Sequence, residues 1–122
     1  MTISEEMRNV GWFLLDKLNL AQFSIDAMFW SDFDEGDFRL YLATPLVDSS
    51  GTLFTYELLG KIFAENHLDS EWGFAIYEVT LIGLKHPKLA EIRQRYGSVP
   101  PDRKWVRRVS LSSGGAYVYF LK

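Results

Sequence analysis

The sequence predicts an α+β fold with a single domain that spans residues 1–122. Stripes of apolar residues with helical spacing alternate along the chain with segments in which every second residue is apolar. The order of these segments is helix, strand, strand, helix, strand, helix, strand, strand (α-β-β-α-β-α-β-β). We therefore expect about five strands in one mainly antiparallel sheet, with three helices largely on one side of it.

The composition favours a globular protein and excludes several other classes. Of the 122 residues, 48% are hydrophobic and 24% are charged, and the net charge of -3 is too small for a disordered chain. The absence of cysteine excludes disulfides, thiolate metal sites and cysteine nucleophiles. Residues 1–6 lack the features of a signal peptide, and no run of about 18 apolar residues occurs. We expect a cytoplasmic protein without membrane contact.

The first expected helix has one apolar face and a clear start. Its stripe consists of Met7, Val10, Gly11, Leu14, Leu15 and Leu18. Thr2 and Glu5 have the spacing of a capping box. Gly11 lowers the helix propensity by about 1 kcal/mol relative to Ala. A close approach of this helix to the sheet would explain why a glycine is present here. Trp12, Phe13 and Asn19-Leu20 widen the apolar surface beyond the stripe.

A hairpin is expected next, because two segments of alternating polarity flank a polar, glycine-containing turn at residues 34–37. If the turn is centred on its first two residues, Trp30 lies opposite Arg39 and Met28 lies opposite Tyr41. These four side chains would then share the second face of the sheet. Arg39 could lie over the indole ring of Trp30 as a cation–π pair.

The remaining segments complete the expected order. They are a turn at 48–51, a helix at 53–66, a loop at 67–70, a strand at 74–84, a helix at 87–96 and a hairpin formed by 105–111 and 116–121. The strand at 74–84 is apolar and rich in β-branched residues, so we expect a central strand covered on both faces. Pro87 is suited to the first turn of its helix and Gly97 to its end.

The small net charge conceals an uneven distribution along the chain. Residues 1–84 contain four basic and fourteen acidic residues, whereas residues 85–108 contain eight basic and two acidic residues. A nucleic-acid site in the basic segment would use Lys88, Arg95, Arg103, Lys104, Trp105, Arg107 and Arg108. Cations contact phosphates and an exposed ring can stack on a base. The alternative is that these charges protect an edge strand or pair internally.

The residues that could support catalysis do not form a complete motif. Carboxylates occur in the hairpin turn at Asp32, Asp34, Glu35 and Asp37. Their spacing resembles the start of a calcium loop, but the distal glutamate is absent. His67 and His86 are isolated in loops, and Glu78 lacks the lysine of a metal-nuclease motif. We therefore expect no metal, no cofactor and no catalytic residue, and a metal-dependent hydrolase is the weakest hypothesis.

One pattern combines an aromatic pair, a polar turn, an aromatic-Arg-Leu strand that ends in Thr-Pro, and an aromatic final strand: Phe29-Trp30, residues 37–48, Gly51 and residues 116–119. This pattern resembles small uncharacterised bacterial proteins. The resemblance covers most of the chain and implies a self-contained bacterial domain, and it brings no activity or site residue with it.

These observations favour an interaction domain over an enzyme. The leading hypothesis is contact with a protein partner, or self-association as a homodimer, through Met28, Trp30, Arg39 and Tyr41. Tyr, Trp and Arg are the residues most enriched at binding hot spots. If a helix covers that face, the same residues belong to the core. Nucleic-acid binding through residues 85–108 is the second hypothesis.

Overall fold

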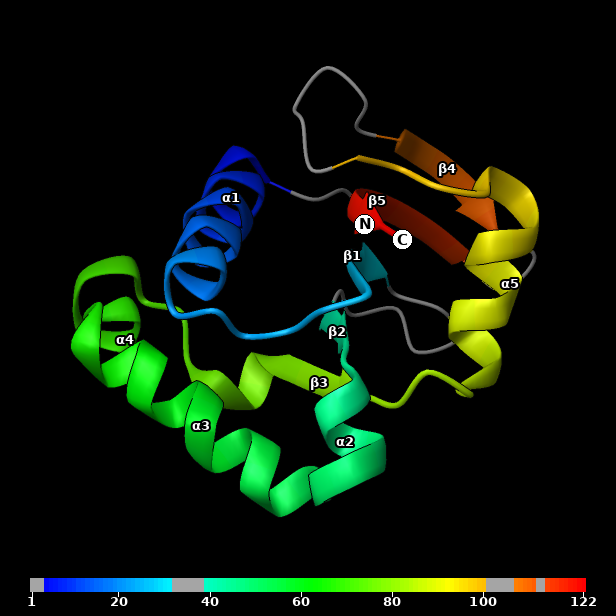
Figure 1. Ribbon diagram of the computed structural model, residues 1–122. Coiled ribbons are helices and arrows are strands. Elements are labelled where there is room, and N and C mark those ends of the chain that lie inside the picture. The colour runs from blue at the N-terminus through cyan, green and yellow to red at the C-terminus, as the bar shows by residue number, and fades with distance from the viewer. Residues whose placement is uncertain (1–3, 32–38, 101–106, 112–113) are drawn as a thin grey trace.

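The computed structural model describes residues 4–31, 39–100, 107–111 and 114–122, and it has the predicted α+β class. The elements are α1 (Glu5–Leu20), β1 (Ala27–Ser31), β2 (Arg39–Ala43), α2 (Pro45–Ser50), α3 (Thr52–Glu65), α4 (Leu68–Trp72), the 3-10 turn η1 (Ile76–Glu78), β3 (Val79–Ile82), α5 (Pro87–Tyr96), β4 (Arg107–Leu111) and β5 (Gly114–Leu121). The strands form one sheet in the order β3-β2-β1-β5-β4 (Figure 1).

The sheet is mixed. β1 is central and runs antiparallel to β2 and β5, β4 is antiparallel to β5, and β2 and β3 are parallel. The prediction of a central strand at 74–84 is wrong, because β3 is shorter and lies at the edge of the sheet. Tyr56 of α3 covers this edge: its hydroxyl accepts a hydrogen bond from the Leu81 N–H and donates one to the Val79 carbonyl. This contact explains how an apolar strand is accommodated at an edge.

The described residues contain more helices than the three we expected, because two segments predicted as a turn and a loop are helical. Thr44 caps α2, where its hydroxyl accepts a hydrogen bond from the Leu46 N–H at 3.2 Å, and Pro45 occupies the first turn. Gly51 separates α2 from α3 with a φ of 90°. α4 begins after His67, which has a φ of 54°. Among the described helices, none has both the length and the apolar character needed to cross a membrane.

Helices cover both faces of the sheet and create two apolar clusters. α1, α3 and α4 lie on one side in Figure 1, and α5 lies on the other. On the first side, Leu14 and Leu59 are fully buried with Trp30 of the central strand. On the second side, Leu89 and Ile92 of α5 are fully buried against the sheet. The apolar stripe expected on α1 faces the core as predicted. The expectation that the helices lie largely on one side of the sheet is wrong, because α5 covers the second face.

α1 approaches the sheet closely at Gly11. A Cβ atom at this position would overlap the hydroxyl of Tyr119, which confirms the reason expected for this glycine. The Tyr119 hydroxyl accepts a hydrogen bond from Trp30 Nε1 and donates one to the Arg8 carbonyl, both at 2.8 Å. A bulge in β5 places Tyr119 here, because the register between β1 and β5 shifts after Met28. This network connects α1 to the centre of the sheet.

Candidate functional site

The four hairpin residues that we expected on one surface lie on opposite faces of the sheet. Trp30 pairs with Leu40, one residue further along than the predicted partner Arg39, and Met28 is shifted away from Tyr41 in the same way. A slip of one residue moves a side chain to the other face. Met28 and Trp30 are 0% and 2% exposed in the apolar cluster that contains residues of α1, α3 and α4, so they are core residues. The predicted common face is therefore wrong.

Arg39 and Tyr41 lie on the second face, where they are partly buried. Arg39 donates hydrogen bonds from Nε to the Thr80 hydroxyl at 2.8 Å and from Nη2 to the Tyr77 carbonyl at 2.7 Å. The expected cation–π pair with Trp30 is wrong, because the two side chains are on opposite sides of the sheet. Tyr41 stacks on Phe29 with the ring centroids 5.3 Å apart. These two hydrogen bonds of Arg39 connect β2 to β3 and to the 3-10 turn η1 that precedes it.

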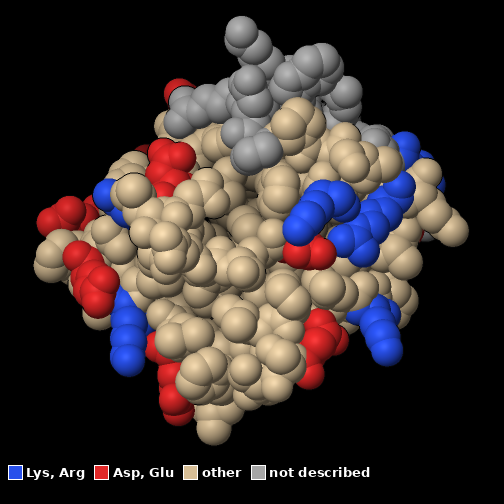
Figure 2. Space-filling view, in the orientation of Figure 1, with Lys and Arg blue, Asp and Glu red and all other residues tan. Residues whose placement is uncertain are grey.

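The basic segment is only partly within the described residues. Arg103, Lys104 and Trp105 lie outside them, and Arg107 and Arg108 open the edge strand β4. Lys88 and Arg95 belong to α5. Figure 2 shows blue side chains gathered over the α5 side of the molecule, whereas red ones predominate over α1, α3 and α4. Binding of nucleic acid by this segment stays a prediction.

Two of the candidate catalytic residues, His86 and Glu78, have structural contacts. His86 caps α5, because its Nδ1 accepts a hydrogen bond from the Lys88 N–H at 3.1 Å. Burial lowers the pKa of His86 from its usual value, and the positive charge of Lys88 lowers it further. The Glu78 carboxylate accepts a hydrogen bond from the Ala75 N–H at 2.9 Å. The acidic turn at 32–37 lies outside the described residues.

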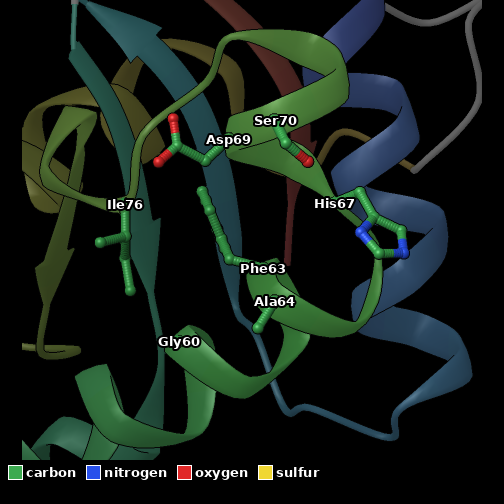
Figure 3. Close-up of a pocket in the computed structure, with 7 residues that line it drawn as sticks. All are labelled: Gly60, Phe63, Ala64, His67, Asp69, Ser70 and Ile76. Atoms are coloured by element: carbon green, nitrogen blue, oxygen red, sulfur yellow. The ribbon is translucent and has the colours of Figure 1, made fainter.

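A hollow of about 450 Å³ lies between α3, α4 and η1 (Figure 3). Its lining residues are Gly60, Phe63, Ala64, His67, Asp69, Ser70 and Ile76. Figure 3 shows His67 and Asp69 on opposite sides of Phe63, with their side chains directed apart. A serine hydrolase needs its histidine between the nucleophile and the acid, joined to both by hydrogen bonds. The presence of Ser70, His67 and Asp69 in one hollow therefore does not indicate this chemistry.

A different surface combines the exposed Trp72, the partly buried Phe13 and acidic side chains. Phe13 of α1 stacks on Trp72 of α4, with the ring centroids 4.7 Å apart and the planes 26° from parallel. Lys17 Nζ lies 5.1 Å from the centroid of Phe13. Trp72 is 42% exposed and Leu20, at the end of α1, is 76% exposed. The stacked rings of Phe13 and Trp72 thus form an apolar ridge where α1 and α4 meet.

Hollows lie beside both rings of this ridge. The hollow beside Phe13 has a volume of about 590 Å³ and is lined by Phe13, Asp16, Lys17, Asn19 and Leu20. The hollow beside Trp72 has a volume of about 300 Å³ and is lined by Glu6, Asn9, Glu71 and Trp72. We call the ridge and these two hollows the α1–α4 surface. Each hollow combines an aromatic ring with at least one carboxylate, so it suits a side chain with both apolar and cationic parts.

The sequence contained a partial signal for this surface. Phe13 and Leu20 were identified as apolar residues outside the α1 stripe, but the sequence did not show what contacts them. Trp72 was missed because it lies between the predicted loop at 67–70 and the predicted strand at 74–84, so no element was assigned to it. In the structure, α4 turns Trp72 back onto α1.

Comparisons with known proteins do not assign this chain to a family. No protein-family model matches the sequence, and no curated protein and no solved structure matches it. In the described parts of the chain, His, Asp and Glu side chains form no group of three or more that could hold a metal ion. We therefore infer the function from the chemistry of the exposed surfaces.

Proposed function

We propose that this protein is an interaction domain that acts by protein–protein contact through the α1–α4 surface. The observation that carries the proposal is the stack of Phe13 on the half-exposed Trp72. Tryptophan is the residue type most enriched at binding hot spots, where a partner covers the ring and excludes water. Leu20 extends the same apolar surface along α1.

The ridge is held in place before a partner arrives. Phe13 supports one face of the Trp72 ring, and Lys17 lies over the Phe13 ring. Side chains that are already ordered lose less conformational entropy on binding, so more of the contact free energy contributes to affinity. The hollows beside the ridge supply the concave shape into which side chains of a partner can fit.

The experiment is affinity capture from native cells with the wild-type protein and two variants. Trp72→Ser removes the anchor, and Leu53→Ser removes an apolar side chain of α3 that is 75% exposed and does not belong to the α1–α4 surface. We expect Trp72→Ser to lose the captured partner and Leu53→Ser to retain it. Light scattering of the purified proteins shows whether the partner is a second copy. Equal capture by both variants contradicts the proposal.

Nucleic-acid binding through residues 85–108 is the second candidate. The basic side chains over α5 in Figure 2 favour it, because clustered cations attract phosphates. Retention on an anionic polymer should fall steeply with salt concentration. Reversal of Arg107 and Arg108 to glutamate should abolish that retention, and unchanged retention excludes this function.

A further inference from the structure

We infer that the α1–α4 surface receives a basic amphipathic helix, an inference that rests on the proposed function and adds the kind of partner. The charges of the two hollows carry it. Glu6 and Glu71 line the hollow beside Trp72, and Asp16 lines the hollow beside Phe13. Among the described residues of these two linings, Lys17 is the one basic residue, and it lies over the Phe13 ring. A partner with cations on both sides of an apolar stripe complements this pattern.

The surrounding surface has the same sign of charge. α1 and α4 together carry five acidic and two basic residues. Red side chains predominate on this side of the molecule in Figure 2, whereas the blue ones concentrate over α5. A negative surface attracts a basic segment over a distance comparable to the Debye length, about 8 Å at physiological salt, and guides its approach. A partner with acidic flanks would be repelled.

The arrangement along α1 fits a helix. The α1 residues of the two hollows include Glu6, Asn9, Phe13, Asp16 and Leu20, which follow one another at intervals of three or four residues. They therefore form one stripe along the outer side of α1, which has 16 residues and a length of about 24 Å. A helix laid along such a stripe presents anchors with the same spacing.

The expected contacts follow from side-chain chemistry. Apolar residues of the partner cover the Phe13–Trp72 ridge. Lysine or arginine on either side of that stripe extends its aliphatic part into a hollow and brings its charge to the carboxylates. The cation beside Glu6 and Glu71 also lies near the face or edge of Trp72, where a face contact adds a cation–π attraction.

The test uses two synthetic 18-residue helical peptides with the same leucine stripe. One carries lysine on both sides of the stripe, and the other carries glutamate at those positions. Binding of each labelled peptide to the full chain is measured by fluorescence anisotropy at physiological salt. We expect the lysine peptide to bind and the glutamate peptide not to bind.

A pair of charge-reversed variants separates local contacts from general attraction. Glu6→Lys with Glu71→Lys reverses the hollow beside Trp72, whereas Glu57→Lys with Glu65→Lys makes the same change in net charge at exposed positions of α3. Affinity for the lysine peptide should fall by about tenfold or more in the first variant and by about threefold or less in the second. Equal losses overturn the inference.

The outcomes also separate this inference from the proposed function. If both peptides bind equally well and Trp72→Ser abolishes both, the α1–α4 surface is an interface and the basic partner is wrong. If neither peptide binds, the basic helix is likewise wrong, while the capture experiment continues to decide whether the surface binds a protein at all.

Discussion

α1 and α5 cover opposite faces of one sheet, but their outer sides differ. Both helices bury an apolar stripe completely, as Leu14 of α1 and Ile92 of α5 show. The outer side of α5 carries charged residues such as Arg95, which is typical of a helix in contact with water. The outer side of α1 retains Phe13 and the exposed Leu20. Apolar residues in excess of what the core requires distinguish a binding surface from an ordinary helix face.

The inner side of α1 should be the part of the molecule most sensitive to substitution. Gly11→Ala raises helix propensity, which alone would stabilise the fold by about 1 kcal/mol. Because the new Cβ overlaps the Tyr119 hydroxyl, we expect instead a loss of about 2–3 kcal/mol in the free energy of unfolding, measured with urea. A gain in stability would show that α1 is not held against the sheet at this point.

Tyr119→Phe tests the hydrogen bonds beneath α1. The change leaves the buried Trp30 Nε1 without its acceptor and removes the bond to the Arg8 carbonyl. We expect a loss of about 1–3 kcal/mol, measured by urea unfolding. Tyr77→Phe is the matched control, because Tyr77 is 76% exposed and its carbonyl, not its hydroxyl, accepts from Arg39. Equal effects of both changes would contradict the proposed network.

The contribution of the α5 N-cap to the stability of the fold should depend on pH, because the cap residue is His86. The pKa of His86 is lowered in the folded protein, so folding favours the neutral ring, whose Nδ1 accepts the hydrogen bond from Lys88. Its contribution is complete above the unfolded pKa of about 6.5 and is lost as the pH falls through the lower folded pKa. We expect an effect below about 1 kcal/mol.

His86→Asn supplies the control for this prediction. Asparagine is a good N-cap at every pH, so the difference in stability between wild type and variant should change between pH 7 and pH 5. Thermal unfolding at both pH values measures it. A difference that is independent of pH would show that the His86 ring does not cap α5 as a neutral acceptor.

The outer side of α1 should contribute least to stability. Leu20 is 76% exposed, so Leu20→Ser should change the free energy of unfolding by no more than about 0.5 kcal/mol in a urea titration. The same substitution should weaken binding of the lysine peptide, because it shortens the apolar surface. A large loss of stability would place Leu20 in the core and remove the contrast between the two helices.

Much of the fold could be predicted because hydrophobic periodicity reports burial directly. The stripe of α1 and the bounds of α5 follow from spacing, from Pro87 and from Gly97. β3 could not be placed, because an apolar run does not distinguish a central strand from an edge strand that a helix protects. Here the hydroxyl of Tyr56 protects the edge by hydrogen bonds to the backbone of β3.

The site was harder to predict than the fold because it depends on one register and one short helix. The actual pairing differs from the predicted one by one residue, which separates Trp30 from Arg39. The sequence does not determine how many residues the turn contains, so it could not determine the register of the two strands. α4 has five residues, too few for a periodic pattern, so the position of Trp72 depends on tertiary packing.

The most direct test of the α1–α4 surface is an amide chemical-shift map of the protein titrated with the lysine peptide. We predict that the largest shifts occur along the outer side of α1 and at Glu71 and Trp72, and that the amides of α5 stay unchanged. Shifts concentrated in α5, or spread evenly over the acidic surface, would contradict the assignment of this surface as the binding site.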